Sequence, residues 1–206
     1  MNDINWDLIR SRLKEAVFAL PHFFRNPVQG MRQLPDWDWA TILILQGLFA
    51  AACAALGNLI EHKILRMFMG MFIAPIANYL VLAIIAGFFF YTLMFFFQRE
   101  APFRQVYTHI LFASIPSMLV IMISGLIPQL TIFGLAASLY LLHVSFADHF
   151  QLERKKVKNF FIALMGICTF LWLIQVVKLT SRQEDLRHKA TPESLDILEN
   201  DFKSDN

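Results

Sequence analysis

Long uncharged stretches alternate with short polar segments along most of this chain. Five apolar stretches can be separated, at about residues 39–60, 73–97, 106–127, 130–150 and 160–177. Each is close to the roughly 20 residues that a helix needs to cross the hydrocarbon core of a bilayer. The pattern therefore predicts an all-α polytopic membrane protein with five transmembrane helices.

The first segment follows another pattern, because its apolar residues recur at steps of three or four. This stripe includes Trp6, Ile9, Leu13 and Val17, and the charged residues of the segment lie off it. The spacing predicts an N-terminal amphipathic helix, which Pro21 should end or bend. Two interpretations stay open. The helix lies on the membrane surface with its basic side toward the headgroups, or the stripe packs against the protein's own spans.

These patterns divide the chain into three regions. Residues 1–38 form the cytoplasmic amphipathic helix and an interfacial connector, residues 39–177 form the five-span domain, and residues 178–206 form a polar C-terminal tail. Gly70, Pro75 and Asn78 interrupt the start of the second apolar stretch. We therefore expect the second span to begin near Ile73, after an interfacial or partly re-entrant piece at residues 67–72.

The third span contains a proline. Pro116 removes a backbone donor and frees the Phe112 carbonyl, so a helix kink or local loosening is expected there. Because an unsatisfied polar group in lipid is costly, Ser114, Ser117 and at least two neighbouring spans should shield this segment. The tight turn at Pro128 predicts that the third and fourth spans form an antiparallel hairpin.

Basic residues are unevenly distributed among the loops. With the N-terminus in the cytoplasm, the outer loops hold only Lys63 and Arg66. The inner segments then hold Arg10, Arg12, Lys14, Arg25, Arg32, Arg99, Arg104, Arg154, Lys155, Lys156 and Lys158. The basic residues that begin the tail oppose this orientation, but earlier spans and short loops usually dominate. We expect a cytoplasmic N-terminus and an external or lumenal C-terminus, in the inner membrane if the source is bacterial.

Polar residues gather near the cytoplasmic ends of the third and fourth spans. This candidate polar cluster consists of Tyr107, His109, His143, Asp148, His149 and Glu153. Three interpretations of this cluster are open: solvated residues at the membrane boundary, a structural polar network, and a metal or proton site. The first is favoured, because the last three residues lie where the helix leaves the lipid. No metal or cofactor is expected.

The run FRQVYTHILFASIPSMLV at residues 103–120 is followed by a short apolar turn, another span and a charged linker. This arrangement resembles the Yip-domain family, the Ypt/Rab-interacting proteins, which are small five-span membrane proteins. The resemblance implies a cytoplasmic N-terminus, and eukaryotic relatives that take part in vesicle trafficking alongside small GTPases. It brings no residue with an established catalytic role, and the sequence holds no HExxH, GxSxG, P-loop, GxGxxG or CxxC motif.

Two functional hypotheses follow. The first is a non-enzymatic membrane scaffold or membrane-organising protein of Yip type, whose partners are the lipid bilayer and a cytoplasmic protein. A homo-oligomer is compatible with it, whereas a net charge of +2 gives no reason to expect nucleic acid. The alternative is a small transporter, channel or lipid-moving protein that uses the polar cluster. It requires His109, His143 and Asp148 to converge on one cavity.

Overall fold

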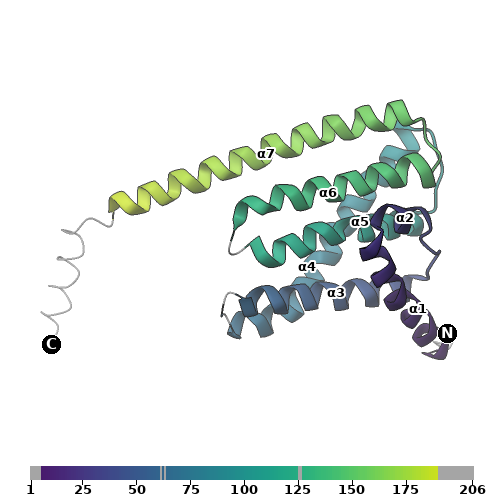
Figure 1. Ribbon diagram of the computed structural model, residues 1–206, viewed down its shortest axis with the longest axis horizontal. Helices are drawn as coiled ribbons and strands as arrows, with labels where there is room; N and C mark the ends of the chain where they lie inside the picture. Colours follow the sequence, from purple (N-terminus) through teal and green to yellow (C-terminus); the bar gives the residue numbers. More distant parts are fainter. Residues whose placement is uncertain (1–5, 61, 63, 125–126, 190–206) are drawn as a thin grey trace, which may run out of the picture. The chain divides into compact units, whose positions relative to one another are not determined.

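The computed structural model of the chain describes residues 6–60, 62, 64–124 and 127–189, although not every side chain in the first and last helices. Helices are the only regular secondary structure among these residues (Figure 1). The chain forms two compact units, Met1–Ile162 and Ala163–Asn206. The α-helices are α1 (Trp6–Arg25), α2 (Pro27–Arg32), α3 (Trp39–Ile60), α4 (Ile64–Tyr91), α5 (Phe103–Ser124), α6 (Thr131–Val144) and α7 (Arg154–Lys189).

Five of the described helical segments are long and apolar enough to cross a membrane. They are Trp39–Ile60, Ile64–Phe96, Phe103–Ser124, Thr131–His149 and Arg154–Lys178. The prediction of an all-α, five-span membrane protein is therefore confirmed.

The second span begins earlier than the sequence suggested. One uninterrupted helix, α4, starts at Ile64 and passes through Pro75, so the expectation of a separate interfacial piece at residues 67–72 is wrong. Its first turns pack closely against α3. A Cβ added at Gly70 would lie only 3.0 Å from the side-chain nitrogen of Asn58, which belongs to α3. Neighbouring helices commonly allow glycine and proline within a membrane helix.

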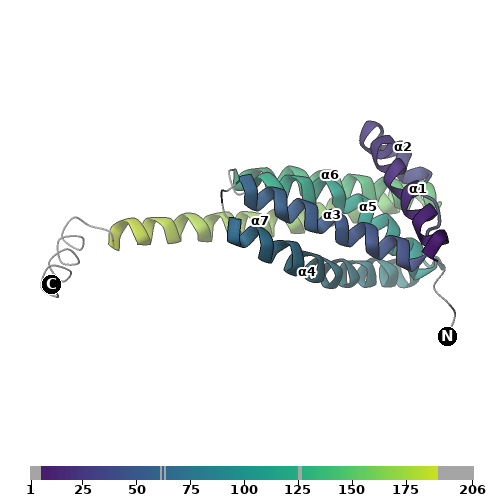
Figure 2. The ribbon, with the colours of Figure 1, turned by 90° about the horizontal axis from the view of Figure 1, so that it is seen from below.

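Helix α5 lies at the centre of the first unit (Figures 1 and 2). It packs against α3, α4 and α6, as expected for a span with a proline in its middle. The helix is continuous through Pro116. Ser117, the residue after Pro116, bonds to α6: its hydroxyl lies 2.6 Å from that of Ser138 and donates to the Gly134 carbonyl at 3.2 Å. These bonds join α5 and α6 as the predicted antiparallel hairpin.

Two helices of the first unit end in the same way. A π-helical turn at Thr92–Phe96 follows α4, and another at Ser145–His149 follows α6. Each is followed by a Phe-Gln pair whose glutamine, Gln98 or Gln151, has φ of 52°. The backbone N–H of the residue after the glutamine then bonds six residues back, Arg99 to Leu93 and Leu152 to Phe146. This repeated turn reverses the chain twice at the same end of the unit.

The last span also begins earlier than expected. Most of the basic linker belongs to α7, which starts at Arg154 rather than near residue 160. Val157 and Phe161 lie one turn apart and are both buried. Their burial anchors the first turns of α7 in the first unit, which explains why helix replaces the expected linker.

The N-terminal region lies across one end of the first unit (Figure 2). Helix α1 contacts α3 and does not end at Pro21, while α2 contacts α5 and α6. Phe23 and Trp37 are buried, and each packs its ring against Phe112 of α5 at a centroid distance of 5.3 Å. On the amphipathic stripe, the side chains of Trp6, Ile9 and Leu13 lie outside the described part, and Val17 is exposed. Membrane contact by α1 therefore stays a prediction.

Candidate functional site at the basic end of the bundle

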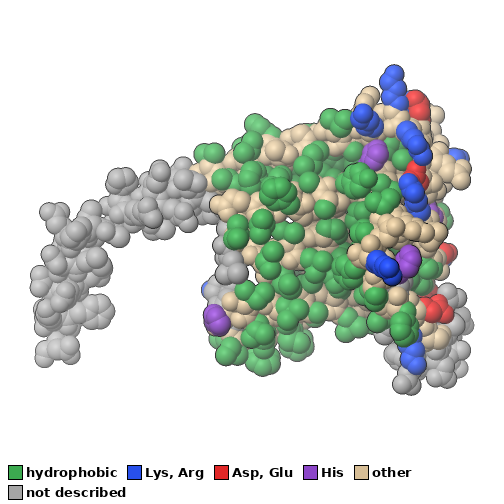
Figure 3. Space-filling model, viewed as in Figure 1, with side chains coloured by type: hydrophobic (Ala, Val, Ile, Leu, Met, Phe, Trp, Pro, Cys, Tyr) green, Lys and Arg blue, Asp and Glu red, His purple; other side chains and the backbone are tan. Residues whose placement is uncertain are grey.

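The charged residues of the first unit gather at the end where α2 and the two Phe-Gln turns lie. Figure 3 shows Lys and Arg side chains at this end, and hydrophobic side chains over the middle of the helices. The basic residues of α2 and these loops are Arg32, Arg99, Arg104, Arg154, Lys155, Lys156 and Lys158. At the opposite end, the described residues of this unit include one Lys or Arg side chain, Arg66, which is exposed.

Two ion pairs fasten the N-terminal region to this end. Arg32 of α2 donates from Nε and Nη2 to Asp148 Oδ2, both at 2.7 Å, and Arg154 Nη2 lies 3.3 Å from Asp148 Oδ1. Arg104 of α5 donates to Asp36 at 2.6 Å. Exposed pairs contribute little to stability, but the Asp148 side chain is only 19% exposed and accepts from two guanidinium groups. Asp148 therefore links α2 to the start of α7.

The structure places His109 against His149. Their ring centroids are 4.2 Å apart, and His109 is only 1% exposed. His109 Nδ1 lies 2.8 Å from the Gln105 carbonyl, while the Gln105 side chain lies 2.7 Å from His149 Nε2. His109 Nε2 is buried without a hydrogen-bond partner among the described residues. This pair is a compact contact between α5 and the end of α6.

The other residues of the predicted polar cluster do not join this histidine pair. His143 packs beside Tyr140 and Phe161, and exposed Glu153 pairs with Lys156 at 2.9 Å. The Tyr107 hydroxyl donates to Gln46 Oε1 at 2.6 Å. The described residues include no group of three His, Cys, Asp or Glu side chains placed to hold a metal ion. Thus the structure brings His143 and Asp148 to one cavity, whereas His109 lies apart from it against His149.

The sequence interpretation missed residues that complete this end of the bundle. Gln46 of α3 joins Tyr107 to Asn78 of α4, to which its side-chain nitrogen donates at 2.7 Å. A glutamine within an uncharged span was the available signal, since buried polar groups in membranes usually have partners. Arg32 and Asp36 carried no such signal, because their partners lie far away in the sequence.

A cavity of about 320 Å³ opens beside the Asp148 ion pairs. We call it the basic cavity. It is lined by Arg32, Tyr140, His143, Val144, Ala147, Asp148, Arg154 and Lys158. Its rim carries cationic side chains, and the rest of its wall is formed by residues of α6.

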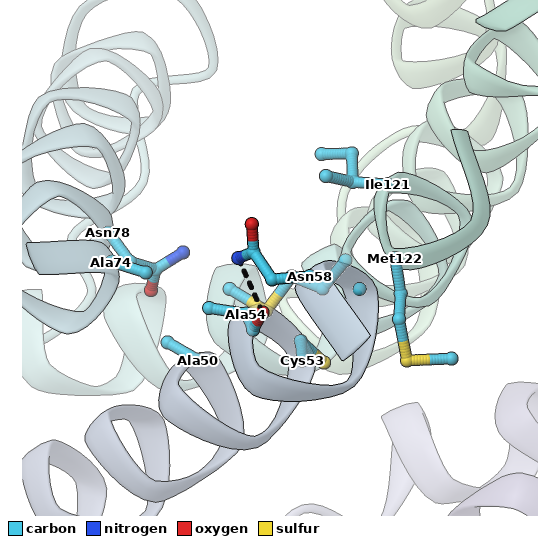
Figure 4. Close-up of a pocket in the computed structure, with 10 residues that line it drawn as sticks. Ala50, Cys53, Ala54, Asn58, Ala74, Asn78, Ile121 and Met122 are labelled. Atoms are coloured by element: carbon cyan, nitrogen blue, oxygen red, sulfur yellow. Dashed lines mark hydrogen bonds between the residues drawn. The ribbon is translucent and has the colours of Figure 1, made fainter. Parts of the chain in front are cut away.

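A second cavity, of about 330 Å³, lies among α3, α4 and α5 (Figure 4). Small side chains such as Ala50, Ala54 and Ala74 form much of its wall, and Asn58 and Asn78 are its most polar lining residues. Asn58 donates to the carbonyl of Ala54 at 2.8 Å, and Asn78 accepts from Gln46. These bonds give both amides a structural role within or between helices.

Together, the five apolar helices and the charged end define a polytopic helical membrane protein. The Yip1 domain family model matches residues 22–175, and the chain belongs to this family. The match confirms the resemblance seen in the sequence, and it extends from the end of α1 into α7. Searches of curated proteins and of solved structures found no match.

Replacing His109 with leucine should change the free energy of unfolding by no more than about 1 kcal/mol. The substitution removes the bond to the Gln105 carbonyl, but it also removes the buried Nε2 that has no partner in the described part. Thermal unfolding of the purified protein in detergent would measure the change, and elemental analysis should find no stoichiometric metal in either variant. One transition metal per chain, lost in His109→Leu, would contradict this prediction.

Proposed function

We propose that this Yip1-family protein is a non-enzymatic membrane scaffold. Its N-terminus and basic end face the cytoplasm, and its C-terminus lies on the external or lumenal side. The basic end binds a cytoplasmic protein partner and the anionic surface of the membrane. The observation that carries this proposal is the gathering of Lys and Arg side chains at one end of the first unit.

The charge distribution supports this orientation in physical terms. Short loops rich in Lys and Arg remain on the cytoplasmic side, and anionic lipids of that leaflet attract basic residues near the surface. Arg154 has a side chain that is 83% exposed, and Lys155 and Lys158 are also exposed. These cations are therefore available to a partner or to headgroups.

The N-terminal region adds to this surface. The ion pairs of Arg32 with Asp148 and of Arg104 with Asp36 hold α2 and the connector beside the basic loops. Exposed Val17 and Phe18 give α1 an apolar contribution that suits contact with the interface. A surface that is already held rigid binds a partner more tightly, because less conformational freedom is lost on binding.

The transport alternative has less support. It required His109, His143 and Asp148 to share a cavity, but His109 is buried against His149 and does not line the basic cavity. None of these three residues lines the cavity among α3, α4 and α5. No specific observation therefore favours a path through the polar cluster.

Single-cysteine labelling tests the proposed function. Cys53 and Cys168 are first replaced by alanine, and cysteine is then placed at Lys155, Arg66 or Asp185. An impermeant maleimide applied to the external or lumenal face of sealed membranes should reach positions 66 and 185, and position 155 only after permeabilisation. A cross-linker attached at position 155 should capture a protein partner in native membranes, whereas one at position 66 should not. Labelling of positions 155 and 185 from the same side would contradict the five-span orientation.

A further inference from the structure

The basic cavity has more positive than negative charge. Its lining holds three cationic side chains, those of Arg32, Arg154 and Lys158, and a single carboxylate, that of Asp148. Asp148 uses its two oxygens to bind the two arginines. Lys158 has no ion-pair partner among the described residues, and each guanidinium keeps further N–H donors. The cavity therefore holds hydrogen-bond donors and positive charge that the protein itself does not neutralise.

The placement of these cations suits a single anionic group. Arg154 and Lys158 are four residues apart in α7, so they lie on the same face one turn apart. Arg32 approaches the same cavity from α2, where its two bonds to Asp148 fix its guanidinium. A guanidinium fork and an ammonium are the side chains that most often bind phosphate oxygens.

The remaining wall of the cavity is formed by α6, with the imidazole of His143 beside an apolar strip. Tyr140, Val144 and Ala147 recur at steps of three or four, and with Asp148 they extend about 12 Å along the helix. The charged lining lies at the end where α6 leaves the apolar span, and Tyr140 lies within that span. A free inorganic anion would use only the rim. An amphiphile with a phosphate and an acyl chain would use the rim and the strip together.

We propose that the basic cavity binds one anionic phospholipid, with its phosphate between Arg154, Lys158 and Arg32 and the start of an acyl chain along Tyr140 and Val144. The proposal deepens the proposed function, because it names the ligand of the basic end, and it rests on that end facing a leaflet that contains anionic lipid. Asp148 then holds the arginines in position, and its negative charge keeps the site from being occupied by highly charged soluble anions.

The test is lipid retention by the full chain. Protein in nanodiscs of phosphatidylcholine with a minor fraction of phosphatidylglycerol is transferred to detergent, and the retained lipids are counted by native mass spectrometry. One phosphatidylglycerol should stay bound to the unmodified chain. Arg154→Gln/Lys158→Gln should reduce its retention on the order of tenfold or more, since each basic residue near a headgroup contributes about a factor of five.

The chain offers a matched control. Lys155→Gln/Lys156→Gln removes the same charge from neighbouring residues of α7 that do not line the basic cavity, and it should retain the lipid. All four side chains are exposed, and each double variant breaks one exposed ion pair, Arg154 with Asp148 or Lys156 with Glu153, so the two should change thermal unfolding equally little. Lys158→Gln alone breaks no ion pair among the described residues and provides a milder variant. Equal loss in both double variants would overturn the proposal in favour of unspecific attraction, and no loss in either would overturn it outright.

Two further measurements distinguish a lipid headgroup from free phosphate as the ligand. Millimolar inorganic phosphate should not displace the lipid, and Tyr140→Glu should release it. Displacement by phosphate would replace the lipid by a free anion as the ligand. Because nanodiscs expose both ends of the protein to the same lipids, retention does not depend on orientation. A failed labelling experiment with retained lipid would thus refute the proposed function and leave the site intact.

Discussion

Replacing Trp37 with alanine should lower the free energy of unfolding by about 3–5 kcal/mol, the range for large aromatic side chains lost from a packed core. Trp37 is only 1% exposed, and its ring lies against that of Phe112, which also packs against Phe23. Its indole nitrogen has no hydrogen-bond partner among the described residues, so the loss comes from packing. Denaturant-dependent unfolding of the purified protein in detergent measures it.

Trp39 provides a control of the same residue type. It is 40% exposed at the start of α3, and its ring centroid lies 6.0 Å from that of Phe103 and 5.4 Å from that of Tyr107. Trp39→Ala should therefore cost less than half as much. Limited proteolysis should also cleave the connector between α2 and α3 faster in Trp37→Ala than in Trp39→Ala. Equal destabilisation by the two substitutions would show that Trp37 does not hold the connector in place.

Adding a single methyl group at Gly134 should destabilise the α5–α6 hairpin by about 1–3 kcal/mol, the usual cost of overpacking. A Cβ at this position would lie 2.9 Å from Val120 Cβ and 3.1 Å from Ser117 Cα, so the two backbones must separate. That separation also lengthens the bonds that Ser117 makes to Gly134 and Ser138. Thermal unfolding of Gly134→Ala in detergent should show the loss directly.

Gly87 of α4 is the matched position for this substitution. A Cβ there would meet no atom within 4 Å, so Gly87→Ala should be neutral or slightly stabilising, because alanine is the better helix former. The two substitutions thus add the same methyl group, at Gly134 against close atoms of α5 and at Gly87 into open space. A Gly134→Ala protein as stable as the Gly87→Ala protein would mean that α5 and α6 can move apart at no cost.

Much of the fold could be predicted from the sequence because membrane helices are defined by length and hydrophobicity. Five apolar stretches gave five spans, and Pro116 with its neighbouring serines correctly indicated a span surrounded by others. The predicted start of the second span differs from the observed start of α4 for a physical reason. Gly70 and Pro75 interrupt helices in water, but here packing against α3 keeps the helix intact.

The candidate site was less accessible to sequence reasoning. Polar residues near the ends of the third and fourth spans could be recognised, and the structure places His109 against His149. The partners that fix the site come from elsewhere in the chain: Arg32 reaches Asp148, and Gln46 reaches Tyr107. A periodic pattern reveals which face of a helix is polar. It does not reveal which distant segment that face will meet.

The two π-helical turns have a consequence for how the chain can change in length. A π turn holds one more residue than the α turn that it replaces, and such turns act as single-residue insertions within a helix. Those at Thr92–Phe96 and Ser145–His149 follow well-packed stretches that contain buried Phe89 and Leu142. A one-residue deletion in either turn can be absorbed by a return to α-helix. The packed residues upstream of each turn would then keep their register.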